Sequence, residues 1–205
     1  AHRVLLFARL GQVRAEKLQE APMALAAFHE VIKLEPDHPE ALAALEGYLQ
    51  DPDLRVEAAE ILEPLYLNDS EWEKLSGIYQ IRLEAADDPE RRVDYMTRIA
   101  QLQEDQLEDL EQAFSWYGKV FLERPADLGV RDQLLRLAGN LENWEELTSV
   151  LSEYLADNLS EDETSRDVAI LLGGLYDERL SKVSEAAGCY RRALEANRED
   201  EEAFQ

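Results

Sequence analysis

The sequence predicts an all-α protein, a solenoid of antiparallel helix hairpins with about 11–12 helices. Apolar residues recur three or four positions apart along almost the whole chain, which places them on one face of a helix. The breaks between these stretches are short, and two sets of segments repeat at fixed shifts. The chain has only 9 glycines and 7 prolines in 205 residues, which disfavours sandwiches and barrels because these need frequent special turns.

The first helices show how each element is recognised. Leu6, Leu10 and Val13 form one apolar stripe, and Leu25 and Phe28 begin the next. Asp and Ser residues in the breaks cap the helix that follows, and proline fits its first turn. Linkers of two to five residues make consecutive helices antiparallel. Helices are therefore expected at 2–18, 21–35, 39–50, 54–67, 71–86, 89–107, 109–124, 127–140, 143–157, 162–180 and 183–197, with another starting at 199.

These helices are expected to form one array over 1–205. Each segment is bounded by a polar or proline-containing break, such as Asp87-Asp88-Pro89 or Arg124-Pro125. The expected segments are a first hairpin at 1–38, irregular helices at 39–86, a second hairpin at 89–125, a degenerate hairpin at 127–157, a third hairpin at 162–198, and the start of a further helix at 199–205.

One internal repeat relates the three hairpins. Segment 3–36 aligns without gaps with 92–125, a shift of 89 residues, and 8 of the 34 positions are identical. A further shift of 73 residues reaches the third copy. Small residues recur on both helices of each copy, which lets the two helices approach closely, and an aromatic residue fills the space beside that contact. The small residues are Gly11, Ala100 and Gly173 on the first helices and Ala24, Ala113 and Ala186 on the second; the aromatic residues are Phe28, Tyr117 and Tyr190.

A second repeat relates the intervening helices. Trp72-Glu73-Lys74-Leu75 recurs as Trp144-Glu145-Glu146-Leu147 after 72 residues, not 89. The first block therefore holds 17 residues that the second lacks (89 minus 72), which is one helix of about 25 Å. We expect this extra helix near 51–67 to produce an irregular elbow, with Pro64 kinking or ending it.

The third copy carries a Leu-Gly pair, an aromatic residue, and then a small, an aromatic and a small residue: Leu172, Gly173, Tyr176, Ala186, Tyr190 and Ala193. This pattern resembles the tetratricopeptide repeat (TPR), although Arg198 replaces the closing proline. The first copy matches at Leu10, Gly11, Ala24, Phe28 and Pro36. All three copies carry one extra residue in the turn relative to the usual unit. The resemblance implies a right-handed solenoid whose first helices line a concave groove for extended peptides.

The resemblance also places particular residues in this groove. No lysine or asparagine occurs among them, so the carboxylate clamp of chaperone-binding members is absent from the expected site. The groove is mixed in the first copy and acidic later. The expected groove residues are Arg9, Gln12, Asp94, Arg98, Gln101, Asp105, Asp167, Ile170, Leu171 and Glu178.

Composition excludes several other functions. The chain has 45 acidic and 21 basic residues, a net charge of -24, which disfavours a nucleic-acid partner. Its longest apolar stretch, from Val168 to Tyr176, is far shorter than the ~20 residues of a membrane helix, so membrane insertion is not expected. The single Cys189 excludes an internal disulfide, and no two of the three histidines have the spacing of metal ligands. We expect no catalytic residue, cofactor or metal site.

The sequence thus indicates a non-catalytic scaffold for protein–protein interaction, a fragment of a longer repeat protein that binds extended peptide segments, with basic segments as candidates. The apolar ends, beginning with Val4-Leu5-Leu6-Phe7, also predict self-association. Recurrence at matched positions favours core packing for Trp72 and Trp144 over a role as partner anchors. The alternative function is an enzyme-associated domain that positions a catalytic domain outside this chain.

Overall fold

The described chain is entirely helical. The structure, a computed structural model, describes residues 2–158 and 162–203. These residues form eleven α-helices and one short π-helix, without a strand among them. The chain divides into two compact units, Ala1–Leu102 and Gln103–Gln205. The all-α prediction is confirmed, and most expected helix ends lie within two residues of the observed ones.

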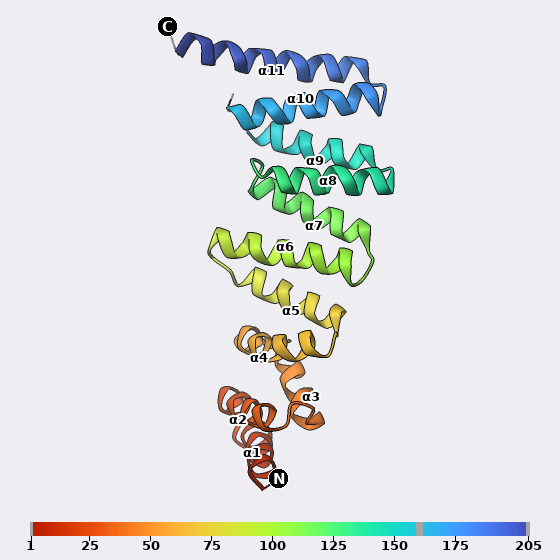
Figure 1. Cartoon of the computed structure of the whole chain (residues 1–205). Helices are drawn as coiled ribbons and strands as arrows, with labels where there is room; N and C mark the ends of the chain where they lie inside the picture. Colours follow the sequence, from red (N-terminus) through yellow and green to blue (C-terminus); the bar gives the residue numbers. More distant parts are fainter. Residues whose placement is uncertain (1, 159–161, 204–205) are drawn as a thin grey trace. The chain divides into compact units, whose positions relative to one another are not determined.

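The first unit consists of consecutive helices, each packed on the next from α1 to α5 (Figure 1). The last three residues of α6 belong to the second unit, so the expected hairpin at 89–125 is divided between the two. The elements are α1 (His2–Val13), the π-helix η1 (Arg14–Leu18), α2 (Ala21–Leu34), α3 (Pro39–Tyr48), α4 (Arg55–Asn68), α5 (Trp72–Glu84) and α6 (Pro89–Asp105).

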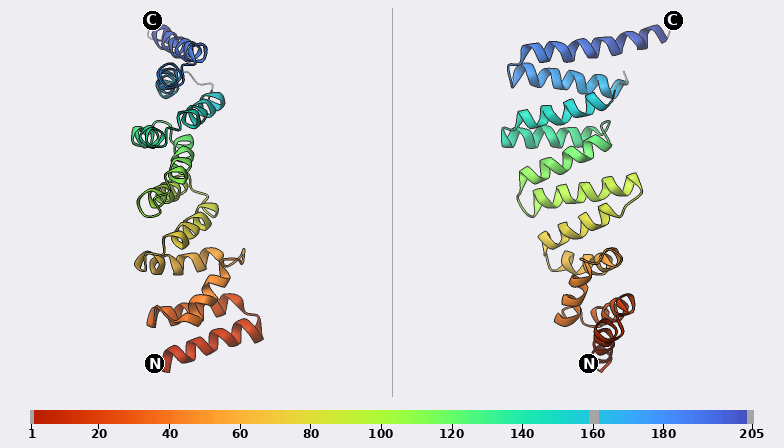
Figure 2. Two further views of the ribbon diagram at one scale, coloured as in Figure 1. Left: turned by 90° about the vertical axis from the view of Figure 1, so that its right-hand side faces the viewer. Right: turned by 180° about the vertical axis from the view of Figure 1, so that it is seen from behind.

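The second unit repeats this arrangement. Each helix from α7 to α11 packs on the next, and α7 also touches α9. Figure 2 shows α10 and α11 side by side and antiparallel, in the segment expected to be the third hairpin. The elements are α7 (Leu110–Glu123), α8 (Leu128–Leu141), α9 (Trp144–Asp157), α10 (Glu163–Glu178) and α11 (Val183–Ala203).

The expected helix start at 199 is wrong. Helix α11 continues without a break from Val183 to Ala203. The reason is Arg198, which stands where the first two copies carry Pro36 and Pro125. Without proline, no backbone N–H is lost and no ring opposes the helix. Residues 204 and 205 lie outside the described residues.

The segment at 39–86 changes the direction of the helix axes within the first unit. In Figure 1, α1 and α2 are foreshortened while α5 and α6 run across the view, and in the left view of Figure 2 α1 and α2 lie across it. Of the two alternatives expected at Pro64, the ending of the helix is wrong, since α4 continues to Asn68, while the kink stays a prediction. Both Pro64 and Glu60 are exposed, so the proline ring and the residue whose carbonyl loses its donor lie on the solvent side of the helix, where a proline is tolerated best.

A polar cluster ties α3 to the two helices that follow it. The Glu46 Oε1 atom accepts hydrogen bonds from Tyr66 at 2.8 Å and from Lys74 at 2.9 Å. The hydrogen bonds from Lys74 and Tyr66 lower the pKa of Glu46, and burial together with the Glu46 contact raises the pKa of Tyr66. The carboxylate of Glu46 therefore joins α3, α4 and α5.

In the first and third copies, the small and aromatic residues of the repeat meet. A Cβ atom placed on Gly11 would lie 2.7 Å from the Phe28 ring, and one on Gly173 would lie 2.7 Å from the Tyr190 ring. The alanines at the matched second-helix position, including Ala24, are buried. Hairpins α1–α2 and α10–α11 thus pack through the same glycine–aromatic contact, in which a Cβ atom would overlap the ring.

The backbone conformation of the turns also repeats, although the amino-acid types at these positions differ. Gln19, Glu108 and Ser181 have φ of 56°, 54° and 54°, and they are related by the shifts of 89 and 73 residues. Ser70 and Glu142, with φ of 58° and 54°, are related by the shift of 72. These five are the non-glycine residues of positive φ in the described chain. Each lies shortly after the end of a helix, in the left-handed conformation usually taken by glycine.

Backbone hydrogen bonds distinguish the two kinds of turn. In the three hairpin copies an N–H bonds a carbonyl six residues earlier: Glu20 to Arg14 (2.9 Å), Asp109 to Gln103 (2.8 Å) and Lys182 to Tyr176 (2.7 Å). In the other pair the bond spans five residues: Glu71 to Tyr66 (2.9 Å) and Asn143 to Ala138 (3.0 Å). The five-residue span is that of the Schellman motif. The extra residue of each hairpin copy therefore widens its turn, and in the first copy this turn is the π-helix η1.

We expect Gly11→Ala to destabilise the protein by about 1–3 kcal/mol, because the new methyl group overpacks the buried Phe28 ring. Gly173→Ala should cost less, since the Tyr190 ring is partly exposed and is free to shift. Gly77→Ala on α5 is the control: nothing lies within 4 Å of its Cβ, so it should stabilise by about 0.5–1 kcal/mol. Urea unfolding measures all three, and equal effects at positions 11 and 77 would contradict the glycine–aromatic contact.

We expect Glu142→Gly to stabilise the protein by about 0.5–1 kcal/mol, because glycine takes a φ of 54° without the steric cost that a Cβ atom imposes. Glu142→Ala removes the same side chain but keeps the Cβ atom, and it should give no such gain. Thermal and urea unfolding of the two variants test this. A gain for alanine equal to that for glycine would assign the effect to charge removal.

Candidate functional site

A pocket of about 450 Å³ lies between α8, α9 and α10 in the second unit. Its lining combines apolar side chains with charged groups from α8 and the end of α10, so it offers both a surface for an apolar group and polar contacts beside it. The lining residues are Leu135, Arg136, Trp144, Ile170, Leu171, Gly174, Leu175, Glu178 and Arg179.

Helix α10 shapes the pocket through its two faces. The helix begins at an Asp162 cap, whose carboxylate accepts the Ser165 N–H at 2.7 Å. One face buries Val168 and Leu172 against neighbouring helices, which leaves the other face open. On that open face, a Cβ atom at Gly174 would meet only the Tyr190 hydroxyl, at 4.0 Å. Packing therefore does not require this glycine, and its missing side chain leaves the pocket wider.

The charged groups at the pocket are held by different partners. The guanidinium of Arg136 pairs with Glu104 and bonds Gln133. The guanidinium of Arg179 lies 4.7 Å from the centre of the Trp144 ring, within the range of a cation–π interaction. These contacts orient a tryptophan and two arginines, residue types that contribute strongly to protein interfaces.

Some of the predicted groove residues lie at this pocket and others do not. The pocket brings together three predicted groove residues, Ile170, Leu171 and Glu178, while Asp167 lies half-buried on the same helix outside it. Arg136, Trp144 and Arg179 were not expected there. Core packing for Trp144 is wrong, since the ring is half-buried and lines the pocket. The sequence feature that could have indicated the exposure of Trp144 is its place as the first residue of α9. No preceding turn of that helix covers one side of the ring.

The groove residues of the first copy bond a neighbouring helix. Arg9 donates to Gln12 at 3.1 Å, and Gln12 donates to Glu40 on α3 at 3.2 Å. This chain of hydrogen bonds joins the first helices of two successive helix pairs. Arg9 and Gln12 therefore lie on the side of α1 that faces the start of α3, and both retain contact with solvent.

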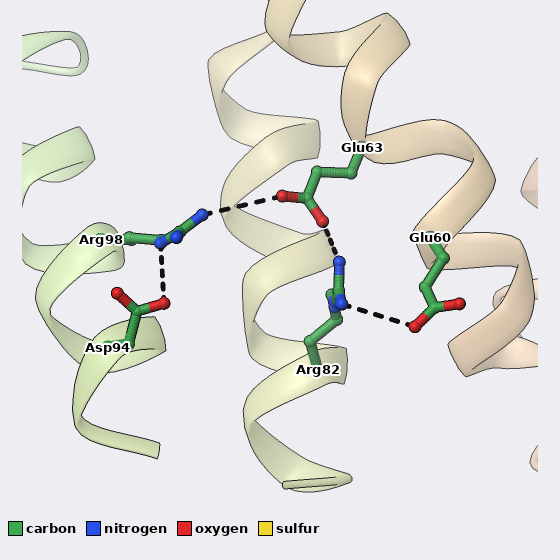
Figure 3. Close-up of polar contacts among 5 residues, drawn as sticks. All are labelled: Glu60, Glu63, Arg82, Asp94 and Arg98. Atoms are coloured by element: carbon green, nitrogen blue, oxygen red, sulfur yellow. Dashed lines mark hydrogen bonds and ion pairs between the residues drawn. The ribbon is translucent and has the colours of Figure 1, made fainter. Parts of the chain in front are cut away.

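Two further predicted groove residues belong to an ion-pair network on α4, α5 and α6, drawn in Figure 3. Arg98 pairs with Asp94 at 2.9 Å and with Glu63 at 3.9 Å. Arg82 pairs with the same Glu63 and lies 3.4 Å from Glu60. The carboxylate of Glu63 thus bridges Arg82 and Arg98, and the carboxylate of Asp94 is already paired with Arg98. The remaining predicted residues, Gln101 and Asp105, are exposed on α6.

No group of three His, Cys, Asp or Glu side chains among the described residues could hold a metal ion. None of the helices in this part of the chain has the length and hydropathy to cross a membrane. Cys189 is half-buried beside a second pocket of about 340 Å³, and burial raises the pKa of its thiol, which favours the unreactive protonated form.

No model of a known protein family matches the chain, and no curated protein matches it significantly. Solved structures do align with it. TTC0263, a thermophilic TPR protein of Thermus thermophilus, is 24% identical over 97% of this chain and 94% of its own, with a TM-score of 0.32. A Podospora anserina structure with nearly identical TPR-like repeats is 14% identical, over 97% of this chain and 95% of its own, with a TM-score of 0.38. BtubC (BKLC) from P. vanneervenii is 18% identical, over 98% of this chain and 89% of its own, also with a TM-score of 0.38.

Structures of TPR and TPR-like proteins thus align with nearly the whole chain. In this chain, sequential antiparallel helix pairs pack on one another, with a glycine under an aromatic ring in α1–α2 and α10–α11.

We expect Glu63→Gln to destabilise the protein by about 1–2 kcal/mol, because a partly buried carboxylate between two arginines is lost. Glu60→Gln is the matched control: this side chain is mostly exposed and should change stability by less than about 0.5 kcal/mol. Urea unfolding with the Arg82→Met and Glu63→Gln double-mutant cycle isolates the pair. A coupling of zero would show that the network is only a surface arrangement.

Proposed function

We propose that the protein is a non-catalytic scaffold for protein–protein interaction, and that the pocket between α8, α9 and α10 receives an apolar side chain of an extended peptide segment. The observation that carries this proposal is the convergence of Ile170, Leu171 and Trp144 on one pocket. Ile170 is 48% exposed, and a large apolar side chain open to water beside a tryptophan favours a partner that covers both.

The size and composition of the pocket support a peptide ligand. A volume of about 450 Å³ is within the usual range of binding sites and exceeds that of a single leucine or phenylalanine side chain. Leu135, Leu171 and Leu175 supply apolar contact, whereas Arg136 and Arg179 offer donors to peptide carbonyl groups. Such a site takes one apolar anchor and fixes the backbone that carries it.

The charge of the chain favours basic residues beside the anchor. The net charge is -24, and Glu178 is exposed where it lines the pocket. Long-range attraction between opposite charges raises the association rate more than the affinity, and salt screens it. The proposed ligand is therefore an extended segment with one large apolar residue and flanking lysine or arginine.

We expect Ile170→Ser to weaken the binding of such a peptide at least about 10-fold, since it removes apolar contact at the centre of the site. The ligand is obtained by selecting phage-displayed random peptides on the whole chain. Affinity is then measured by isothermal titration for the wild type and for two variants. Leu128→Ser is the control, because Leu128 is an exposed apolar residue on α8 that does not line this pocket.

In the same experiment, Glu178→Gln should slow association with a basic peptide and reduce its dependence on salt. Both Ile170 and Glu178 are exposed, so neither substitution should disturb folding, which circular dichroism checks. Equal weakening by Ile170→Ser and Leu128→Ser, or no weakening by either, would place the peptide elsewhere and refute the pocket as the site.

A further inference from the structure

Helix α11 presents an apolar face without a partner in the described chain. Val183, Ala187, Tyr190 and Leu194 are four, three and four residues apart, which places them on one side of a helix. Val183 and Leu194 are each 68% exposed, and Tyr190 and Ala187 are also open to solvent. The adjacent side of the helix, with Ala186 and Ala193, is buried.

The repeat shows what this face does in the other copies. The residues equivalent to Ala187, Tyr190 and Leu194 are fully or almost fully buried there, and in both copies the following helix packs on the one that carries them: α3 on α2, and α8 on α7. These equivalents are Leu25, Phe28 and Ile32 on α2, and Phe114, Tyr117 and Phe121 on α7. The exposed face of α11 is therefore the surface on which the repeat packs its next first helix.

Helix α1 presents the complementary face. Leu6 is 57% exposed and Leu10 is 39% exposed. Their equivalents in the third copy, Val168 and Leu172 on α10, are buried, and α10 packs on the preceding helix α9. The residue equivalent to Arg3 is Ser165, whose hydroxyl lies 3.3 Å from that of Tyr154 on α9. The exposed face of α1 is thus the surface that a first helix packs on the helix before it.

We propose that a second copy of this chain covers both faces: α11 of one copy packs on α1 of the next, as α9 packs on α10 within the chain. The interface continues a contact that the protein already makes internally. Charge supports the pairing, because the α1 stripe is flanked by basic Arg3, Arg14 and Lys17. By sequence, 1–38 has five acidic and five basic residues, whereas 153–205 has 14 and 6, a net charge of -8.

This contact joins two different surfaces, so it is heterologous and leaves one free face at each end of any oligomer. The protein should therefore form oligomers that grow with concentration instead of a closed symmetric dimer. Two substitutions distinguish open oligomers from a closed symmetric dimer. Leu6→Glu places a charge on the α1 face, and Leu194→Glu places one on the α11 face; each should weaken self-association at least about 10-fold.

The test is sedimentation equilibrium of the whole chain over a range of concentrations. The wild type should increase in mean mass with concentration, and each variant alone should remain monomeric. An equimolar mixture of the two variants should form a 1:1 dimer that does not grow, since only one intact face of each kind is present. Leu128→Glu, an exposed leucine on α8, is the control and should associate as the wild type does.

Three results would overturn the proposal. A wild type that is monomeric up to about 0.5 mM would exclude a second copy as the occupant. A variant that still dimerises alone would indicate a symmetric contact through its unaltered face. A mixture of variants that stays monomeric would show that the two faces do not bind each other. Circular dichroism of each variant confirms that both exposed positions accept the substitution without unfolding.

Discussion

The close approach of two helices at a glycine, with an aromatic ring filling the gap, is the contact on which hairpins α1–α2 and α10–α11 depend. At Gly11 and Gly173 the ring lies where a Cβ atom would be, so the helix axes come nearer than any larger residue allows. A pair packed this closely still has apolar residues on its outer sides, and these need a neighbour. Stacking of successive helices meets that need, and the polar cluster at Glu46 and the ion pairs at Glu63 add contacts between the stacked helices.

The adjacent glycines of α10 show how one helix serves both the core and the pocket. Gly173 faces Tyr190 and allows the hairpin to close, whereas Gly174, one position on, faces the pocket and leaves it open. Since neighbouring residues on a helix are about 100° apart, Gly173 lies on the side that faces α11 and Gly174 on the side that faces the pocket. The burial of Val168 and Leu172 fixes the orientation in which Ile170 and Glu178 reach the pocket.

The helices were predictable because their signals are local and periodic: apolar stripes three or four residues apart, and breaks with proline or a capping acid. The features that escaped prediction depend on context. Pro64 continues its helix because its ring is on the exposed side, and α11 passes residue 199 because Arg198 does not interrupt it. The pocket residues Arg136 and Trp144 come from helices with no groove pattern of their own, so only their spatial meeting with α10 reveals them. The left-handed turn residues are Gln, Ser and Glu, types that carry no signal for this conformation.

The two turn widths have a consequence for recombination of the segments. In one kind of hairpin the backbone hydrogen bond across the turn spans six residues, and in the other it spans five. The second helix of the first kind is therefore shifted by one residue relative to the second helix of the other kind. One residue corresponds to about 100° of rotation, enough to carry an apolar stripe from the core to the solvent. A second helix grafted from one kind of segment onto the other would therefore keep its sequence but lose its orientation. Exchange among α2, α7 and α11, or between α5 and α9, preserves the phase because the members of each set follow turns of one width, whereas exchange between the two sets preserves it only when the turn is transferred with the helix.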